Sequence, residues 1–301
     1  MSDLLTIIIN VISPIFLVAA LGFVIGKRYA PDTRVLSLLL VYVFVPVLTF
    51  NGIRTSALSL GDLARLGGLV LLLCVIMTLL GLAIARWLGW DRRLRGAFVT
   101  TMVLVNGANY GVPVNRFAFG PAGEQVAIVY YVLNNLIGNV VGVYYSSGGS
   151  ARREALLNVL RVPITYAAFA GLVFNLLKIE LPTPLARSAD IAAQGAIPLM
   201  LVLLGLQLAA TPVRGRWRPV LIGAGMRLVV SPLIAWGLAL ALGLQGAVLA
   251  AAVVQSGMPN AVLTNALAAE FGSDREYTAL MTLFSTLASI LTLSVLIHLL
   301  G

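Results

Sequence analysis

The chain has 301 residues, of which 60% are hydrophobic and only 10% are charged, and its mean hydropathy is +1.00. Soluble domains carry about 25% charged residues, so this composition indicates an integral membrane protein. The net charge of +9 does not indicate nucleic-acid binding, because the arginines lie in short loops between apolar segments. The single cysteine, Cys74, excludes an intrachain disulfide.

Ten apolar segments separated by polar residues are each close to the length of about 20 residues that a helix needs to cross a bilayer. They are 4–26, 35–53, 64–88, 97–118, 124–146, 156–178, 189–210, 218–242, 246–270 and 276–300. We expect the first to be a retained span, because it is longer than the core of a signal peptide. Around the start of the sixth, residues 151–162 alternate arginine with leucine, which predicts a short interfacial helix joining two halves.

The distribution of basic residues predicts the orientation of these spans. Fourteen Lys and Arg residues lie in or beside the odd-numbered connections, against five beside the even-numbered ones. Because short basic loops stay in the cytoplasm, the odd connections are predicted to be cytoplasmic and both termini to be outside. We therefore expect a multi-pass protein of the cell (inner) membrane.

Short sequence elements recur in the same order in the two halves, at offsets of 149 to 152 residues. The pairs are Pro14-Ile15 with Pro163-Ile164, Pro46 with Pro198, and Phe119-Gly120 with Phe271-Gly272. Five spans per half is an odd number, so the second half must insert upside down relative to the first. The sequence therefore predicts an all-α membrane protein of ten helices in two inverted five-helix repeats.

Two spans contain runs that a smooth lipid-facing helix does not tolerate. The fourth holds three Asn, two Gly and one Pro between Val105 and Asn115, and the ninth holds Gln255 to Asn260 with Pro259. Proline and glycine weaken a helix, and irregular backbone inside a membrane survives only in protein or beside a wet cavity. Two broken helices at matching places in two halves predict a transporter's binding site.

If both spans break near mid-membrane and cross, four half-helix ends meet at one point. Half-helix N-termini favour an anion, whereas half-helix C-termini and unwound carbonyls favour a cation. The first candidates for substrate binding are Asn106, Asn109 and Asn260. For Asn115, Ser256 and Asn265, binding and a purely structural role are both open. The structural alternative for all six is that they satisfy the broken backbone or bridge helices.

The fifth span carries Asn134, Asn135 and Asn139, which should face the interior because polar groups are costly in lipid. Adjacent residues on a helix point about 100° apart, so we expect only one of Asn134 and Asn135 to face the crossing. Gly138 and Gly142 form a GxxxG pattern, which is typical of close helix packing.

Arg227 is the one basic residue inside a span, about 14 Å along a helix from Arg218. Such a charge either meets an anionic substrate or clamps carbonyls of the broken helices. Because no acidic residue lies at the same depth, we favour the clamp. Asn51 and Gln207 lie late in their spans, where they could edge a cavity.

No span centre carries Asp or Glu, which argues against a carboxylate proton relay. A sodium site stays open, because amides, hydroxyls and carbonyls also supply oxygen ligands. The sequence has no cluster of metal ligands, no GxSxG and no phosphate-binding loop, so we expect neither an enzyme nor a cofactor.

The broken spans resemble those of the auxin efflux carrier family of transporters, which includes bacterial members and plant PIN proteins. The matching motifs are Asn106, Gly111 and Pro113; Met258-Pro259-Asn260-Ala261 with Glu270-Phe271-Gly272; Val45 to Phe50; Pro198 with Leu204-Gly205-Leu206; and Arg227 with Pro232. The sequence departs from the family at Ala108, where a glycine is common. The connection between its halves is short, which favours a prokaryotic-type member.

The resemblance implies an NhaA-like fold, shared with bile-acid symporters, in which helices 4 and 9 are broken and crossed. It implies a scaffold (1–54 and 149–212, with the interfacial helix) and a transport domain (55–148 and 213–301). It also implies a homodimer through the scaffold helices and elevator-type movement of an organic anion. Family analogy places substrate contacts at Asn106, Asn134 or Asn135, and the prolines Pro113 and Pro259.

These inferences favour a secondary transporter of a small organic anion, with a carboxylate as the first choice. The expected partners of the protein are this anion and the lipid bilayer, and no nucleic acid. The alternative is a sodium-coupled organic-anion symporter of the bile-acid type. A membrane sensor or membrane-embedded enzyme is disfavoured, because the sequence offers no catalytic cluster and no soluble output domain.

Overall fold

The computed structural model describes residues 4–151, 153, 157, 162–211 and 215–301, and its regular elements there are all helical. The first half contains α1 (Leu4–Ile7), η1 (Ile8–Ile12), α2 (Ser13–Tyr29), α3 (Arg34–Leu39), η2 (Leu40–Phe44), α4 (Val45–Arg54), α5 (Leu60–Trp87), α6 (Arg92–Val103), η3 (Gly107–Gly111) and α7 (Val112–Ser146). The second contains α9 (Pro163–Leu176), α10 (Thr183–Ala210), α11 (Trp217–Gly225), η4 (Met226–Val230), α12 (Ser231–Ala241), α13 (Gly246–Ser256), α14 (Leu263–Phe271) and α15 (Arg275–Leu300). The interfacial helix expected at 151–162 lies largely outside the described residues.

Each of the four π-helical turns, η1 to η4, is followed two residues later by a proline. These prolines are Pro14, Pro46, Pro113 and Pro232. A proline ring collides with the carbonyl four residues earlier, and here that carbonyl belongs to the central residue of the π turn. The wider turn gives the carbonyl room, so the helix continues past the proline.

Within the described residues, seven helices are long and apolar enough to cross a membrane, fewer than the ten segments that the sequence predicts. They are Leu4–Tyr29, Arg34–Arg54, Leu60–Trp87, Gly107–Ser146, Thr183–Ala210, Trp217–Ala241 and Arg275–Leu300. The fourth and ninth segments are interrupted, so α6 and α13 are short, and α9 has only 14 residues. Large apolar side chains such as Leu17 and Leu21 are exposed on the outside, as expected of a protein surrounded by lipid.

The fourth and fifth segments run together as α7, whose backbone leaves the helical region at Gly120 (φ 65°, ψ −157°), just before Pro121. Arg116 and Glu124 form an ion pair across this point, although eight residues of straight helix would separate them by about 12 Å. The chain therefore folds back at Gly120, and α7 consists of two arms, 112–119 and 121–146.

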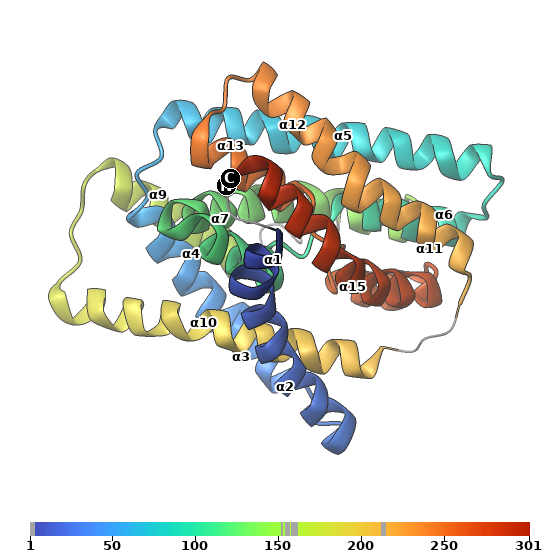
Figure 1. Ribbon diagram of the computed structural model, residues 1–301, viewed down its shortest axis with the longest axis horizontal. Helices are drawn as coiled ribbons and strands as arrows, with labels where there is room; N and C mark the ends of the chain where they lie inside the picture. Colours follow the sequence, from blue (N-terminus) through green and yellow to red (C-terminus); the bar gives the residue numbers. More distant parts are fainter. Residues whose placement is uncertain (1–3, 152, 154–156, 158–161, 212–214) are drawn as a thin grey trace.

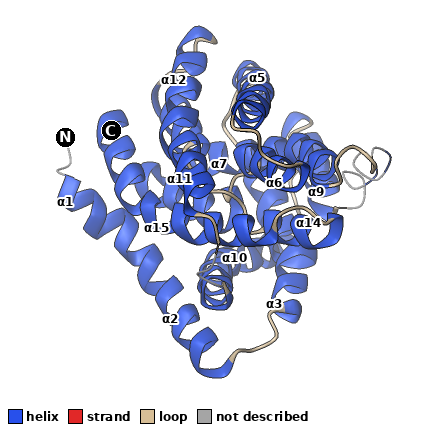
Figure 2. Ribbon diagram, turned by 90° about the vertical axis from the view of Figure 1, so that its right-hand side faces the viewer, coloured by secondary structure: helices blue, strands red, loops and turns tan. Residues whose placement is uncertain are grey.

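The helices form two packed groups on either side of the centre (Figures 1 and 2). In one group α2 packs along α10, and α4 packs along α9 and α10; in the other, α5, α6, α7, α12 and α13 pack together, with α15 against α6 and α11. Gly22 and Gly205 let α2 and α10 approach so closely that a β-carbon on either would strike the other backbone. Both views show α5 and α12 on the side opposite α2 and α10, with α7 between them.

Candidate functional site

The fourth segment breaks after α6. Leu104 leaves the helix in an extended conformation (φ −81°, ψ 115°), and helical structure resumes at Gly107. The ninth segment breaks between Ser256 and Leu263. The prediction that both helices are interrupted is confirmed at these positions.

The two interruptions meet as a short antiparallel pair, which we call the crossing (residues 104–106 and 257–262). Val105 forms a β-bridge with Asn260. The Asn106 amide donates to the Pro259 carbonyl at 2.8 Å, and the Ala261 amide donates to the Leu104 carbonyl at 3.0 Å. Backbone groups released by one broken helix are thus satisfied by the other, as buried backbone requires.

The two prolines named from the sequence have different positions relative to the breaks. Pro259 lies within the second break, whereas Pro113 lies in the first turn of α7, several residues after the first break has closed. The interruption of the fourth segment therefore precedes its proline, and Pro113 is associated with the π turn η3.

Arg227, on η4, is buried and donates hydrogen bonds to three backbone carbonyls. Its Nη1 reaches the Met102 carbonyl at 2.9 Å, its Nε reaches the Met258 carbonyl at 3.0 Å, and its Nη2 reaches the Ser256 carbonyl. These carbonyls belong to the C-terminal ends of α6 and α13 and to the second break. The clamp that the sequence favoured is the arrangement observed.

Asn134, on the second arm of α7, also bonds to backbone groups at the first break. Its Oδ1 accepts from the Val105 amide at 3.3 Å, and its Nδ2 donates to the Val103 carbonyl at 3.0 Å. The carbonyls at the end of a helix have no partner within the helix. At the end of α6, Arg227 binds the Met102 carbonyl and Asn134 binds the Val103 carbonyl. Neighbouring Asn135 is half-buried and accepts from Asn139 Nδ2 at 2.9 Å.

Asn260 is fully buried in a cluster of hydroxyl groups that joins the second break to α14 and α15. Its Nδ2 donates to Thr264 Oγ1 at 3.0 Å and to Thr282 Oγ1 at 2.9 Å, and its Oδ1 accepts from Ser285 Oγ at 2.9 Å. Asn265 accepts from the same Thr282 hydroxyl at 3.5 Å. The Asn260 amide is thus engaged on both ends by the protein itself.

Three buried amide atoms near the crossing have no hydrogen-bond partner within the described part of the chain. They are Asn106 Nδ2, Asn115 Oδ1 and Gln255 Oε1. The other end of Gln255 donates to the Gly107 carbonyl at 3.1 Å and the Ala127 carbonyl at 3.0 Å, joining α13 to η3 and to the second arm of α7. An unsatisfied buried polar group is costly, so these atoms are the ones best placed to bind a solute.

Of the remaining candidates at the crossing, one is half-buried and two donate hydrogen bonds to carbonyls three or four residues earlier in the chain. Asn109 is half-buried on η3, and Ser256 donates its hydroxyl to the Val253 carbonyl one turn back at 2.6 Å. The Asn115 amide nitrogen likewise donates within its own helix, to the Gly111 carbonyl at 2.9 Å.

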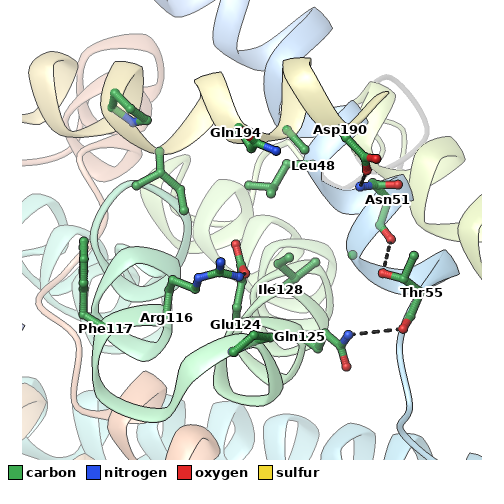
Figure 3. Close-up of a pocket in the computed structure, with 15 residues that line it drawn as sticks. Leu48, Asn51, Thr55, Arg116, Phe117, Glu124, Gln125, Ile128, Asp190 and Gln194 are labelled. Atoms are coloured by element: carbon green, nitrogen blue, oxygen red, sulfur yellow. Dashed lines mark hydrogen bonds and ion pairs between the residues drawn. The ribbon is translucent and has the colours of Figure 1, made fainter. Parts of the chain in front are cut away.

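A cavity of about 500 Å³ opens between α4, α10 and the fold-back of α7 at Gly120 (Figure 3). We call it the kink cavity; its polar lining consists of Asn51, Thr55, Arg116, Glu124, Gln125, Asp190 and Gln194. Asn51, expected to edge a cavity, lies here and donates to Asp190 at 2.8 Å. Ile128 lines the same cavity, and the carbonyl of the preceding residue, Ala127, accepts from Gln255 at the end of α13.

The charged residues of the kink cavity were not among the sequence candidates. Arg116 pairs with Glu124, and Gln125 donates to the Thr55 carbonyl at 3.2 Å, joining α7 to the end of α4. In the sequence Arg116 counts as an ordinary loop charge. Only the fold-back at Gly120 brings it beside Glu124, and only α10 places Asp190 opposite (Figure 3).

The chain is similar to known membrane transport proteins. A family model described as "Membrane transport protein" matches residues 150–297. A protein of Methanothermobacter thermautotrophicus named "Uncharacterized transporter" is 29% identical over 279 residues, which cover 90% of each chain. The "Probable auxin efflux carrier component 5b" of Oryza sativa subsp. japonica is 32% identical over 50% of this chain and 42% of its own. The "Putative malonate transporter" of Rhizobium meliloti is 27% identical over 59% of this chain and 58% of its own.

Proposed function

Because the chain belongs to the membrane transport protein family that includes the auxin efflux carriers, we propose that it is a secondary transporter of a small organic anion of the carboxylate class. Its relatives are named as transporters, and the chain is a multi-pass membrane transporter rather than an enzyme. The choice of an anion is an inference from the electrostatics of the crossing.

The observation that carries this proposal is that a cationic side chain binds the two C-terminal helix ends at the crossing but not the two N-terminal ends. The C-terminal ends of α6 and α13, which carry partial negative charge, are bound by the guanidinium of Arg227. The N-terminal ends that begin at Gly107 and Leu263 keep their partial positive charge. The net field at the crossing therefore favours a negative solute, and the Nδ2 of Asn106 supplies an unpaired donor for it.

The kink cavity is the entry that we propose for such a solute. The side chain of Arg116 is 47% exposed there, so an entering carboxylate can exchange with Glu124 for its guanidinium. The lining is otherwise uncharged except for Asp190, which Asn51 holds with a hydrogen bond (Figure 3).

We further propose ten spans in two inverted repeats with both termini outside the cell (inner) membrane. Two features support the repeat. The first is that each half contains one interrupted span. The second is that the helix after each interruption ends at the recurring Phe-Gly pair, whose glycine has a positive φ: 65° at Gly120 and 75° at Gly272. The packing of α2 along α10 and of α4 along α9 and α10 supports a scaffold for a homodimer and an elevator-type movement of the remaining helices.

Transport in proteoliposomes tests the function directly. Uptake of radiolabelled malonate, succinate and acetate would be measured for the wild type, for Asn106→Ala and for Asn10→Ala, a matched change at an exposed asparagine. Loss of one hydrogen bond to a charged group predicts uptake about tenfold lower for Asn106→Ala and unchanged for Asn10→Ala. If none of these anions enters wild-type vesicles above empty vesicles, or if both variants behave alike, the carboxylate proposal fails.

A sodium-coupled carrier is the second candidate, because two of the unpaired atoms near the crossing are oxygens, Asn115 Oδ1 and Gln255 Oε1. Amide oxygens are suitable ligands for a hard cation. Replacing sodium with choline would abolish uptake in a coupled carrier. Uptake that is equal in the two salts would leave the uncoupled carrier as the function.

A further inference from the structure

A second cavity, of about 300 Å³, lies at the opposite end of α7 from the kink cavity. It is formed by the last turns of α5, the first turns of α6 and the end of α7. Its lining residues are Leu82, Arg86, Arg92, Arg95, Gly96, Tyr144, Tyr145, Gly148 and Gly149. We call it the arginine cavity.

Three arginines and no acidic residue line the arginine cavity. Arg92 donates to the carbonyls of Ser147 and Gly148, both at 3.1 Å, and so fixes the turn that closes the cavity. Arg86 and Arg95 form no ion pair within the described residues. Their charges are therefore available to an anion, and guanidinium groups favour the bidentate geometry of phosphate.

The position of the cavity indicates where that anion comes from. Trp87, next to Arg86, is 85% exposed, and Trp217, at the start of α11, is 47% exposed. Exposed tryptophans mark the level of the lipid headgroups in membrane proteins. The connection from α5 to α6 is also one of the basic connections that predict the cytoplasmic side, where anionic lipids attract arginine.

We propose that the arginine cavity binds the phosphate of an anionic phospholipid headgroup. Arg86 and Arg95 contact the phosphate, and Arg92 positions the Gly148-Gly149 turn around it. The site is independent of the proposed substrate, because it lies at the N-terminal end of α6, whereas the crossing follows the C-terminal end of α6. A bound headgroup holds α5, α6 and α7 together at the membrane surface.

The test measures thermal unfolding of the delipidated full-length protein in detergent, with added phosphatidylglycerol, phosphatidylcholine or inorganic phosphate. Native mass spectrometry counts the lipids that remain bound. The pocket variant is Arg86→Gln with Arg95→Gln. The control is Arg28→Gln with Arg34→Gln, which removes two exposed arginines from another connection predicted to be cytoplasmic. Both changes lower the net charge equally.

We expect phosphatidylglycerol to raise the unfolding temperature of the wild type and of the control, and phosphatidylcholine to have little effect. The pocket variant should bind phosphatidylglycerol about tenfold more weakly. Arg86→Lys with Arg95→Lys should fall between, because lysine keeps the charge but not the bidentate geometry.

Two results would overturn the proposal. The first is equal loss of phosphatidylglycerol binding in the pocket variant and the control, which would make the effect one of general charge. The second is stabilisation by inorganic phosphate that matches the lipid and depends on the same arginines, which would assign the cavity to soluble phosphates. A pocket variant with an unchanged unfolding temperature before lipid is added shows that folding is intact.

Discussion

At Arg227, one guanidinium group meets three backbone carbonyls that the interrupted helices leave without intrahelical partners. A lysine could not take its place, because a compact ammonium group lacks the planar fork that spans carbonyls of different segments. Burying the charge is offset by three charge-assisted hydrogen bonds and by the partial negative charge of two helix ends. The residue is therefore part of the framework that shapes the crossing.

Replacement of Arg227 by glutamine should destabilise the protein more than it alters substrate affinity. The change removes up to three hydrogen bonds, and at roughly 0.6–1 kcal/mol each in a membrane protein we expect a loss of about 2–3 kcal/mol. Thermal unfolding in detergent measures it.

Arg218→Gln is the matched control for Arg227→Gln, because Arg218 is an exposed arginine near the start of the same span. We expect its unfolding temperature to equal that of the wild type. If Arg227→Gln also unfolds like the wild type but no longer transports, Arg227 is a substrate ligand and the clamp is not its main role.

The asparagines show how far the sequence predicts individual roles. Their presence in apolar spans indicated an interior site, but hydrogen-bond partners far along the chain decide what each one does. Asn134 and Asn260 bind protein groups on both ends of their amides, whereas Asn106 keeps an unpaired Nδ2. The same residue type in similar surroundings therefore gives both structural and binding candidates, which only the fold distinguishes.

At the scale of the elements, proline and glycine have separate consequences. Prolines at Pro14, Pro46, Pro113 and Pro232 produce π turns without ending the helix. The reversal within α7 instead depends on Gly120, whose backbone conformation is essentially restricted to glycine. The predicted segments 97–118 and 124–146 placed a boundary here, whereas the irregular run expected between Val105 and Asn115 is non-helical only at its start, because helical structure resumes at Gly107.

Gly120→Ala should lower stability through the backbone alone. A β-carbon at this position meets nothing within 4 Å, so the cost is conformational, about 1–3 kcal/mol. The change should also weaken transport, because Arg116 and Glu124 lie on the two arms that Gly120 connects. Thermal unfolding and malonate uptake measure the two effects.

Gly237→Ala provides the comparison for Gly120→Ala. Gly237 is an exposed helical glycine that also has nothing within 4 Å of an added β-carbon, and its φ is not positive. Alanine favours the helix there, so stability should be unchanged or slightly higher. Equal unfolding temperatures for the two variants would contradict a conformational requirement at Gly120.

At the scale of the whole molecule, the apolar segments and their polar interruptions predicted a helical membrane protein whose broken helices meet. The kink cavity could not be predicted in the same way. Its residues come from α4, α7 and α10, and charges such as Arg116 and Asp190 look like ordinary loop residues until these helices are packed. Periodicity reports which face of a helix is apolar, but not which helix will lie opposite.

Elevator-type transport requires the group containing α7 to slide against the group containing α4, and a covalent bond between the two should stop it. A β-carbon at Gly52 on α4 would lie 2.5 Å from the Cδ1 atom and 3.7 Å from both Cγ atoms of Ile128 on α7, so side chains at these two positions are in direct contact, as a disulfide between them requires. In a Cys74→Ser background, Gly52→Cys combined with Ile128→Cys should lose malonate uptake about tenfold on oxidation and regain it with dithiothreitol. Either cysteine alone should transport equally before and after oxidation. Full-rate uptake by completely crosslinked protein would show that the two groups do not move relative to one another, and the substrate would then have to pass through a fixed crossing.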